Sequence, residues 1–232
     1  MRNSRSLSAK PNSQETMGGF AYLVFQYFFL PSVLAFINSH LADPLKEVEL
    51  NFLFYLINFI SILLIFHDYL GRGLNQVTQH PIIFLESVIL GFVFYYGCDW
   101  LTKKLVGLLV PGFANYNDQA IVDLLHGNAF LMLIGTVILV PPAEECLFRG
   151  LIFRNLYGKS RWAAYIVSIL AFAAIHIIGY IGRYSAVELL MAFLQYLPAG
   201  FCLAWAYTRS DTIFAPIVIH AAINFVSIHT LR

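Results

Sequence analysis

Residues 140–156 read VPPAEECLFRGLIFRNL, an apolar segment that carries two adjacent carboxylates, Glu144 and Glu145, and an arginine, Arg149. The apolar run around it extends over residues 128–155, which is longer than the roughly 20 residues that an α-helix needs to cross a bilayer. An ionisable side chain at the centre of a membrane helix costs about 2.5–3.5 kcal/mol on insertion scales. Charges in such a segment therefore indicate a membrane helix that faces a polar interior.

The composition of the whole chain agrees with a membrane protein. Of its 232 residues, 59% are hydrophobic and 12% are charged, against about 45–50% and 25% in soluble domains. These values exclude an ordinary soluble fold and a disordered chain. The net charge of +1 gives no basic field for a nucleic-acid backbone, so we expect no nucleic-acid partner. Three cysteines, far apart in apolar stretches, give no disulfide framework.

Further apolar stretches are long enough to be membrane spans. Within lipid, only helices and closed barrels satisfy their backbone hydrogen bonds, so the sequence predicts an all-α fold, a polytopic transmembrane helical bundle with about seven spans. We expect residues 1–18 to form a polar N-terminal tail and residues 19–232 to form a single transmembrane domain. The predicted spans cover residues 19–38, 48–66, 81–101, 128–155, 161–180, 187–208 and 212–230.

The distribution of lysine and arginine predicts the orientation, because short cytoplasmic loops are enriched in both. With the N-terminus inside, the inner segments carry nine of these residues and the outer segments five. Counting 1.5 Å per residue from the inner helix ends places Glu144 about 16 Å and His220 about 12 Å deep. These depths favour a cavity that opens on the inner side, with positions Phe148 and Ile223 reachable from it.

Polar side chains recur in the last four predicted spans. Glu145 and Arg149 are four residues apart, a spacing at which helical side chains pair, and Glu144 points about 100° away from Glu145. His176 lies in the following span, and the last span carries a histidine and an asparagine one turn apart. Because these groups fall at similar depths, we expect them to converge on one intramembrane cavity. The candidate site residues are Glu144, Glu145, Arg149, His176, His220 and Asn224.

This set of groups suits the hydrolysis of a peptide bond. A carboxylate such as Glu144 in a low-dielectric cavity is able to act as a general base. The oxyanion then needs donors that are already in place, which His220 and Asn224 supply, each worth about 2.7–4 kcal/mol. Taken singly, each residue also has a structural explanation: a histidine bonded to a carbonyl, a buried ion pair, or an amide that joins two helices.

Three motifs occur in order on successive predicted helices. They are E-E-x-x-x-R at residues 144–149, F-x-x-x-H at residues 172–176 and H-x-x-x-N at residues 220–224. In this order they resemble the CPBP family of intramembrane proteases, also called Abi or type II CAAX prenyl endopeptidase-like proteins. The motif region covers about residues 120–230, roughly the last half of the chain.

The resemblance implies a glutamate-dependent intramembrane endopeptidase in a bacterial cell membrane, with no cofactor. Glu144 and His176 would activate a water, His220 and Asn224 would stabilise the oxyanion, and the other two charges of the first motif would hold the site together. The partners implied are the lipid bilayer and a peptide or lipidated-peptide substrate. Eukaryotic members of the family cut prenylated CAAX peptides, whereas many bacterial members are associated with bacteriocin immunity or peptide maturation.

Other interpretations of the same residues stay open. Glu144, His176 and His220 form a two-histidine, one-carboxylate set that is able to hold a divalent metal such as zinc and leave a position for water. A non-catalytic membrane scaffold or immunity protein would bind another membrane protein through its Phe-rich helices. A transporter would also bury polar groups, although the sequence has no evident inverted repeat. The acidic and histidine side chains of residues 118–126 suggest either a metal cluster or an amphipathic interfacial helix.

Overall fold

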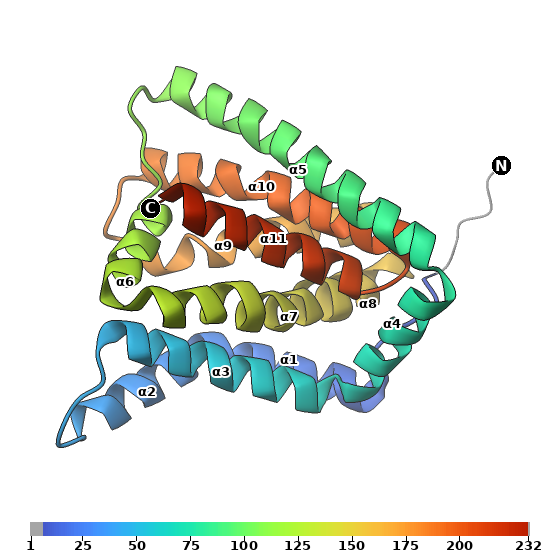
Figure 1. Cartoon of the computed structure of the whole chain (residues 1–232), viewed down its shortest axis with the longest axis horizontal. Helices are drawn as coiled ribbons and strands as arrows, with labels where there is room; N and C mark the ends of the chain where they lie inside the picture. Colours follow the sequence, from blue (N-terminus) through green and yellow to red (C-terminus); the bar gives the residue numbers. More distant parts are fainter. Residues whose placement is uncertain (1–6, 232) are drawn as a thin grey trace.

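The computed structural model describes residues 7–231, and over this range the chain folds into helices with no β-strand (Figure 1). The all-α class predicted from the sequence is confirmed. The helices are α1 (Ser13–Phe28), α2 (Leu30–Ser39), α3 (Glu47–Ile65), α4 (His67–Gln79), α5 (Pro81–Leu109), α6 (Tyr116–Leu133), η1 (Ile134–Leu139), α7 (Val140–Glu145), η2 (Cys146–Phe153), α8 (Arg154–Tyr157), α9 (Arg161–Ile175), η3 (Ile178–Tyr180), α10 (Ala186–Ser210) and α11 (Phe214–Leu231).

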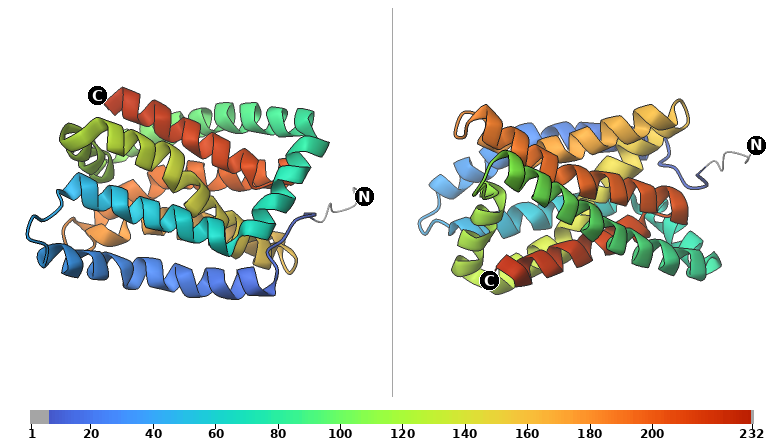
Figure 2. Two further views of the ribbon diagram at one scale, coloured as in Figure 1. Left: turned by 60° about the horizontal axis from the view of Figure 1, so that its bottom comes forward. Right: turned by 90° about the horizontal axis from the view of Figure 1, so that it is seen from above.

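The long helices match the predicted membrane spans. Within residues 7–231, five helical segments are long and apolar enough to cross a membrane: α3, α5, the continuous run from α6 to α8, α9 with η3, and α10. The pair α1 and α2, bent by 47° relative to each other, makes a sixth candidate, and α11 is a shorter apolar helix. This arrangement agrees with about seven spans and makes the chain an integral membrane protein. Figure 2 shows that the axes of the long helices are roughly aligned with one another.

The first helix begins inside the stretch predicted to be a tail. A capping box starts it, since Glu15 N–H donates to Asn12 Oδ1 (2.8 Å) and Asn12 N–H donates to Glu15 Oε2 (2.6 Å). The preceding residues pack against the bundle, where the Arg154 guanidinium donates to the carbonyls of Leu7 (2.8 Å) and Ala9 (3.0 Å). Residues 1–6 of the predicted tail lie outside the described residues.

Small residues let α10 approach its neighbours closely. It packs against α5, α9 and α11, and its buried surface includes Ala192, Ala199 and Ala204. A Cβ on Gly200 would lie 3.2 Å from the Ile169 Cα on α9, so only glycine fits that contact without a shift. Close approach through small residues is the usual way in which membrane helices associate.

The run from α6 to α8 carries the EExxxR motif and is not a regular α-helix. The residues of η1 and η2, on either side of α7, are π-helical. Pro141 and Pro142 lack the backbone N–H that an α-helix needs at those positions, which accounts for the wider turn that precedes them. The non-helical backbone falls instead at Asn128 (φ −162°, ψ 97°), whose Oδ1 accepts from Phe130 N–H and Leu131 N–H. That break coincides with the predicted start of the span at residue 128.

Candidate active site

Four of the predicted site residues line one cavity. Glu144 lies in the last turn of α7, and His176 directly follows α9. His220 and Asn224 lie one turn apart on α11. The cavity that all four line has a volume of about 800 Å³. The helices therefore bring together the groups whose similar depths predicted a shared cavity.

The predicted ion pair lies behind the cavity wall. Arg149 Nη1 donates to Glu145 Oε1 over 2.8 Å, and both side chains are fully buried. The same guanidinium donates through Nη2 to the carbonyl of Gly200 on α10 (3.0 Å) and lies 4.5 Å above the Phe172 ring. Arg149 thus ties the motif helix to α9 and α10, and it offsets the burial of the Glu145 charge.

His220 is held by the same carboxylate, a contact that the sequence did not reveal. Its Nδ1 lies 2.9 Å from Glu145 Oε1, so this oxygen faces both His220 and Arg149. Because an ionised carboxylate only accepts, Nδ1 carries the proton of this bond. The other ring nitrogen, Nε2, lies 4.0 Å from Glu144 Oε2, too far for a direct hydrogen bond. Glu145 therefore orients His220 and turns Nε2 toward Glu144.

His176 is fixed by a carbonyl and an aromatic ring. Its Nδ1 lies 2.8 Å from the carbonyl oxygen of Phe172, which only accepts, so Nδ1 is the donor and Nε2 stays free in the neutral ring. The imidazole stacks on the Tyr196 ring of α10, with centroids 4.1 Å apart and planes 23° apart. Tyr196 also lines the cavity. Sequence reasoning missed Tyr196, because an aromatic residue in an apolar helix carries no distinguishing signal.

Asn224 owes its position to the prolines of the motif helix. The Val140 N–H donates to Gly135 O, a π-helical bond. The matching donor for Thr136 O would be residue 141, which is a proline without an N–H. Asn224 Nδ2 donates to Thr136 O instead, over 2.8 Å. This bond joins α11 to η1 and uses one N–H of the Asn224 side chain. The second N–H and the amide oxygen of Asn224 remain available to other groups.

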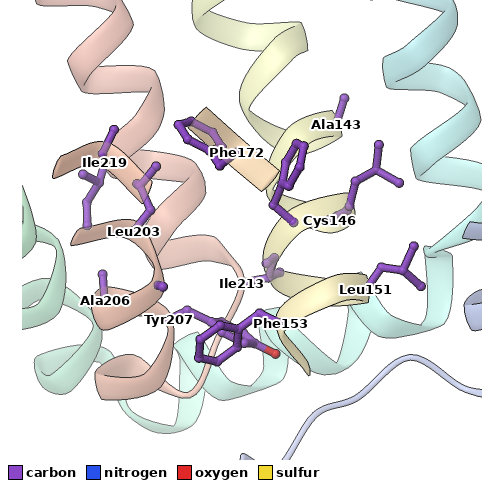
Figure 3. Packing of buried hydrophobic residues seen from close by; sticks show 14 of the residues in the cluster. Ala143, Cys146, Leu151, Phe153, Phe172, Leu203, Ala206, Tyr207, Ile213 and Ile219 are labelled. Atoms are coloured by element: carbon purple, nitrogen blue, oxygen red, sulfur yellow. The ribbon is translucent and has the colours of Figure 1, made fainter. Parts of the chain in front are cut away.

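The lining of the cavity extends toward the end of the bundle opposite to the start of α1, so an N-terminus inside and an inner opening cannot both hold. This lining includes the buried His220, Asn115 just before α6, and the exposed Arg183 between η3 and α10. Figure 1 shows the connections that precede α6 and α10 at the end of the bundle where α11 finishes. Toward the start of α1 the space is filled by core side chains such as Phe153 and Tyr207 (Figure 3). Depth arithmetic gives a distance from a helix end but not the side on which packing leaves space.

Thiol labelling will determine which side of the membrane the cavity faces. Ile223 lines the cavity, so Ile223→Cys is expected to react with a membrane-impermeant thiol reagent added on the side opposite to the N-terminus. Phe148 was expected to be reachable as well, but it is 1% exposed and packs edge-on against Phe172. Phe148→Cys is therefore the matched control and should not react.

The labelling needs a background without native thiols, in which all three cysteines are replaced by alanine: Cys98, Cys146 and Cys202. Labelling of Ile223→Cys only from the side of the N-terminus would contradict the observed lining of the cavity. Equal labelling of Ile223→Cys and Phe148→Cys would show that the buried packing around Phe148 is not present in the membrane.

The described side chains do not form a metal site. Among residues 7–231, no group of three histidine, cysteine, aspartate or glutamate side chains is placed to hold a metal ion, including the polar residues of the stretch 118–126. The metal-dependent alternative is tested by chelation.

Comparisons with known proteins agree with the motif order. Residues 126–226 match the family described as Type II CAAX prenyl endopeptidase Rce1-like, which confirms the resemblance predicted from the motifs. A Bacillus subtilis protein named "Putative membrane peptidase YdiL" is 34% identical over 123 residues, 52% of this chain and 46% of its own length. The "UPF0177 protein YbdI" of Lactococcus lactis is 26% identical over 148 residues, 64% of this chain and 75% of its own length.

The match therefore spans about half the length of the Bacillus subtilis relative. No solved structure matches the chain. All six candidate site residues lie within the matched residues 126–226, whereas α1 to α5 lie outside them.

Proposed function

We propose that this chain is a glutamate-dependent intramembrane endopeptidase, since residues 126–226 match the family described as Type II CAAX prenyl endopeptidase Rce1-like. The observation that carries the proposal is that two adjacent carboxylates have different environments. Glu145 Oε1 bonds to both Arg149 and His220, whereas Glu144 lines the cavity and its Oε2 has no hydrogen-bond partner. A carboxylate held free beside two histidines is suited to take a proton from water.

The proposed reaction uses Glu144 as the general base. Glu144 takes a proton from a water while the free Nε2 of His176 helps to orient that water, and the resulting hydroxide attacks the carbonyl carbon of the scissile peptide bond. When His220 is protonated at both nitrogens, it keeps its Nδ1 bond to Glu145 and presents Nε2–H to the oxyanion. The second N–H of Asn224 is the other donor. Glu144 then passes its proton to the nitrogen of the leaving amine as the C–N bond breaks.

The substrate proposed is a peptide or lipidated peptide that reaches the cavity from the membrane. The matched relatives of Bacillus subtilis and Lactococcus lactis support a bacterial cell membrane as the location. The asymmetry of lysine and arginine supports an N-terminus inside. In that orientation the cavity opens to the outside, which favours substrates that are exported or anchored in the outer leaflet.

The proposal is tested on purified protein in detergent. We expect the wild type to cut at least one membrane-associated peptide from a panel of a farnesylated CAAX peptide, the same peptide without the lipid, and an apolar peptide, with products identified by mass spectrometry. The activity should persist in excess EDTA. Loss of activity in EDTA and its return with zinc would favour the metal-dependent alternative. Failure of the wild type to cut any peptide that binds it would favour the non-catalytic scaffold or immunity protein.

A further inference from the structure

Gln26 on α1 is a buried residue whose side-chain amide oxygen has no hydrogen-bond partner. It is 4% exposed, its Oε1 has no partner, and the residue lines the same cavity as Glu144. A buried acceptor left unpaired costs about 1–3 kcal/mol. Such a cost is typical of a group that is kept for a ligand, because functional sites sacrifice some stability.

A neighbouring amide shows that a buried polar side chain on this side of the cavity is able to find hydrogen-bond partners. Asn58 on α3 is 3% exposed and also lines the cavity. Its Oδ1 accepts from the Tyr22 hydroxyl (2.8 Å), and its Nδ2 donates to Phe54 O (2.8 Å). Asn58 therefore joins α1 to α3, whereas Gln26 on the same wall makes no comparable bond.

The unpartnered atoms of this cavity come from different helices. Besides Gln26 Oε1, they are Glu144 Oε2 on α7 and the Tyr196 hydroxyl on α10. Three residues that line one cavity and each carry an unpaired polar atom form a wall suited to a polar ligand. The ligand would need donors along its length, as a peptide main chain has.

We propose that Gln26 binds a main-chain peptide group of the substrate and positions the chain across the cavity from Glu144. A glutamine amide offers one acceptor and one donor group, which match the N–H and C=O of a peptide unit whatever its side chains. The inference rests on the proposed function and extends it, because Gln26 lies outside the family match at residues 126–226. It gives α1 a part in substrate recognition.

The first test compares stability in detergent, measured as the thermal midpoint. Gln26→Met keeps the side-chain volume and removes the unpaired amide oxygen, so the midpoint should stay equal to that of the wild type or rise. Asn58→Leu removes two buried hydrogen bonds and should lower it. A fall for Gln26→Met as large as that for Asn58→Leu would overturn the proposal, since it would show that Gln26 is a structural residue.

The second test measures binding and does not depend on turnover. In a Glu144→Gln background, a fluorescent peptide that the wild type binds is titrated, together with versions methylated at one main-chain nitrogen at a time. Gln26→Met should raise Kd about tenfold for the parent peptide. In the wild-type Gln26 background, methylation of the main-chain nitrogen that bonds to Gln26 should raise Kd. With Gln26→Met, methylation at that one position should no longer raise Kd, because both changes remove the same bond.

Gln14→Met, an exposed glutamine on the same helix, is the control and should leave Kd unchanged. An unchanged Kd for Gln26→Met, or a methylation penalty that persists at every position, would overturn the role of Gln26. The assay measures binding alone. A result that overturns the role of Gln26 therefore leaves the proposed peptidase activity untouched, and a lack of peptidase activity leaves the role of Gln26 in binding untouched.

Discussion

Glu144→Gln is expected to lower peptide hydrolysis by about 10²–10⁴-fold, the contribution of a positioned general base. Glutamine keeps the volume of the side chain but does not accept a proton from water. Glu144 is partly exposed to the cavity, with a side-chain exposure of 18%, so the neutral amide should leave the helix packing and the thermal midpoint unchanged. The measurement is the turnover of the best peptide of the panel, with the midpoint followed in parallel.

The control for this variant is Glu86→Gln, which removes a carboxylate in an exposed pair with Arg209. Exposed pairs contribute about 0–1 kcal/mol, so Glu86→Gln should keep both activity and stability. Full turnover by Glu144→Gln would show that the general base lies elsewhere.

The second large effect concerns stability and falls on Arg149. Arg149→Met leaves the fully buried Glu145 without its cation, and such an uncompensated charge costs about 3–5 kcal/mol. The thermal midpoint in detergent should therefore fall strongly. Replacing the pair together, with Glu145→Leu and Arg149→Met, should recover much of the stability. It should not recover activity, because His220 then loses the acceptor of its Nδ1.

A surface arginine provides the comparison for this effect. Arg209→Met breaks the exposed pair with Glu86 and should change the free energy of unfolding by less than about 1 kcal/mol. An equal midpoint for Arg149→Met and wild type would mean that the guanidinium is hydrated in the membrane and does not compensate Glu145.

The parts of the fold that depend on local sequence were predictable. The spans follow from the length of the apolar runs, and the pair of Glu145 and Arg149 follows from a spacing of four residues on one helix. The bond between His220 and Glu145 joins residues 75 positions apart, and no spacing rule connects two helices at that distance. The same limit applies to the opening of the cavity, which depends on where side chains such as Phe153 and Tyr207 fill the bundle.

Two further features depend on backbone geometry that the sequence shows only in part. The prolines of the motif helix were expected to loosen it. The structure shows a more specific result, a Thr136 carbonyl that accepts a hydrogen bond from the Asn224 side chain. Gln26 lies within the first predicted span, 19–38, where a single glutamine in an apolar run carries no signal of a binding role. Its lack of a partner becomes visible only when the neighbouring helices are in place.

We propose that Glu144 is the general base that hydrolyses a peptide bond in a membrane-associated substrate. The most direct measurement is a quantitative comparison of membrane peptides and new C-termini in cells that express the wild type, Glu144→Gln or Glu86→Gln. We expect one or more precursors to accumulate with Glu144→Gln alone, with loss of the matching shortened products. Indistinguishable peptide profiles for the wild type and Glu144→Gln, with equal amounts of each protein in the membrane, would contradict the claim.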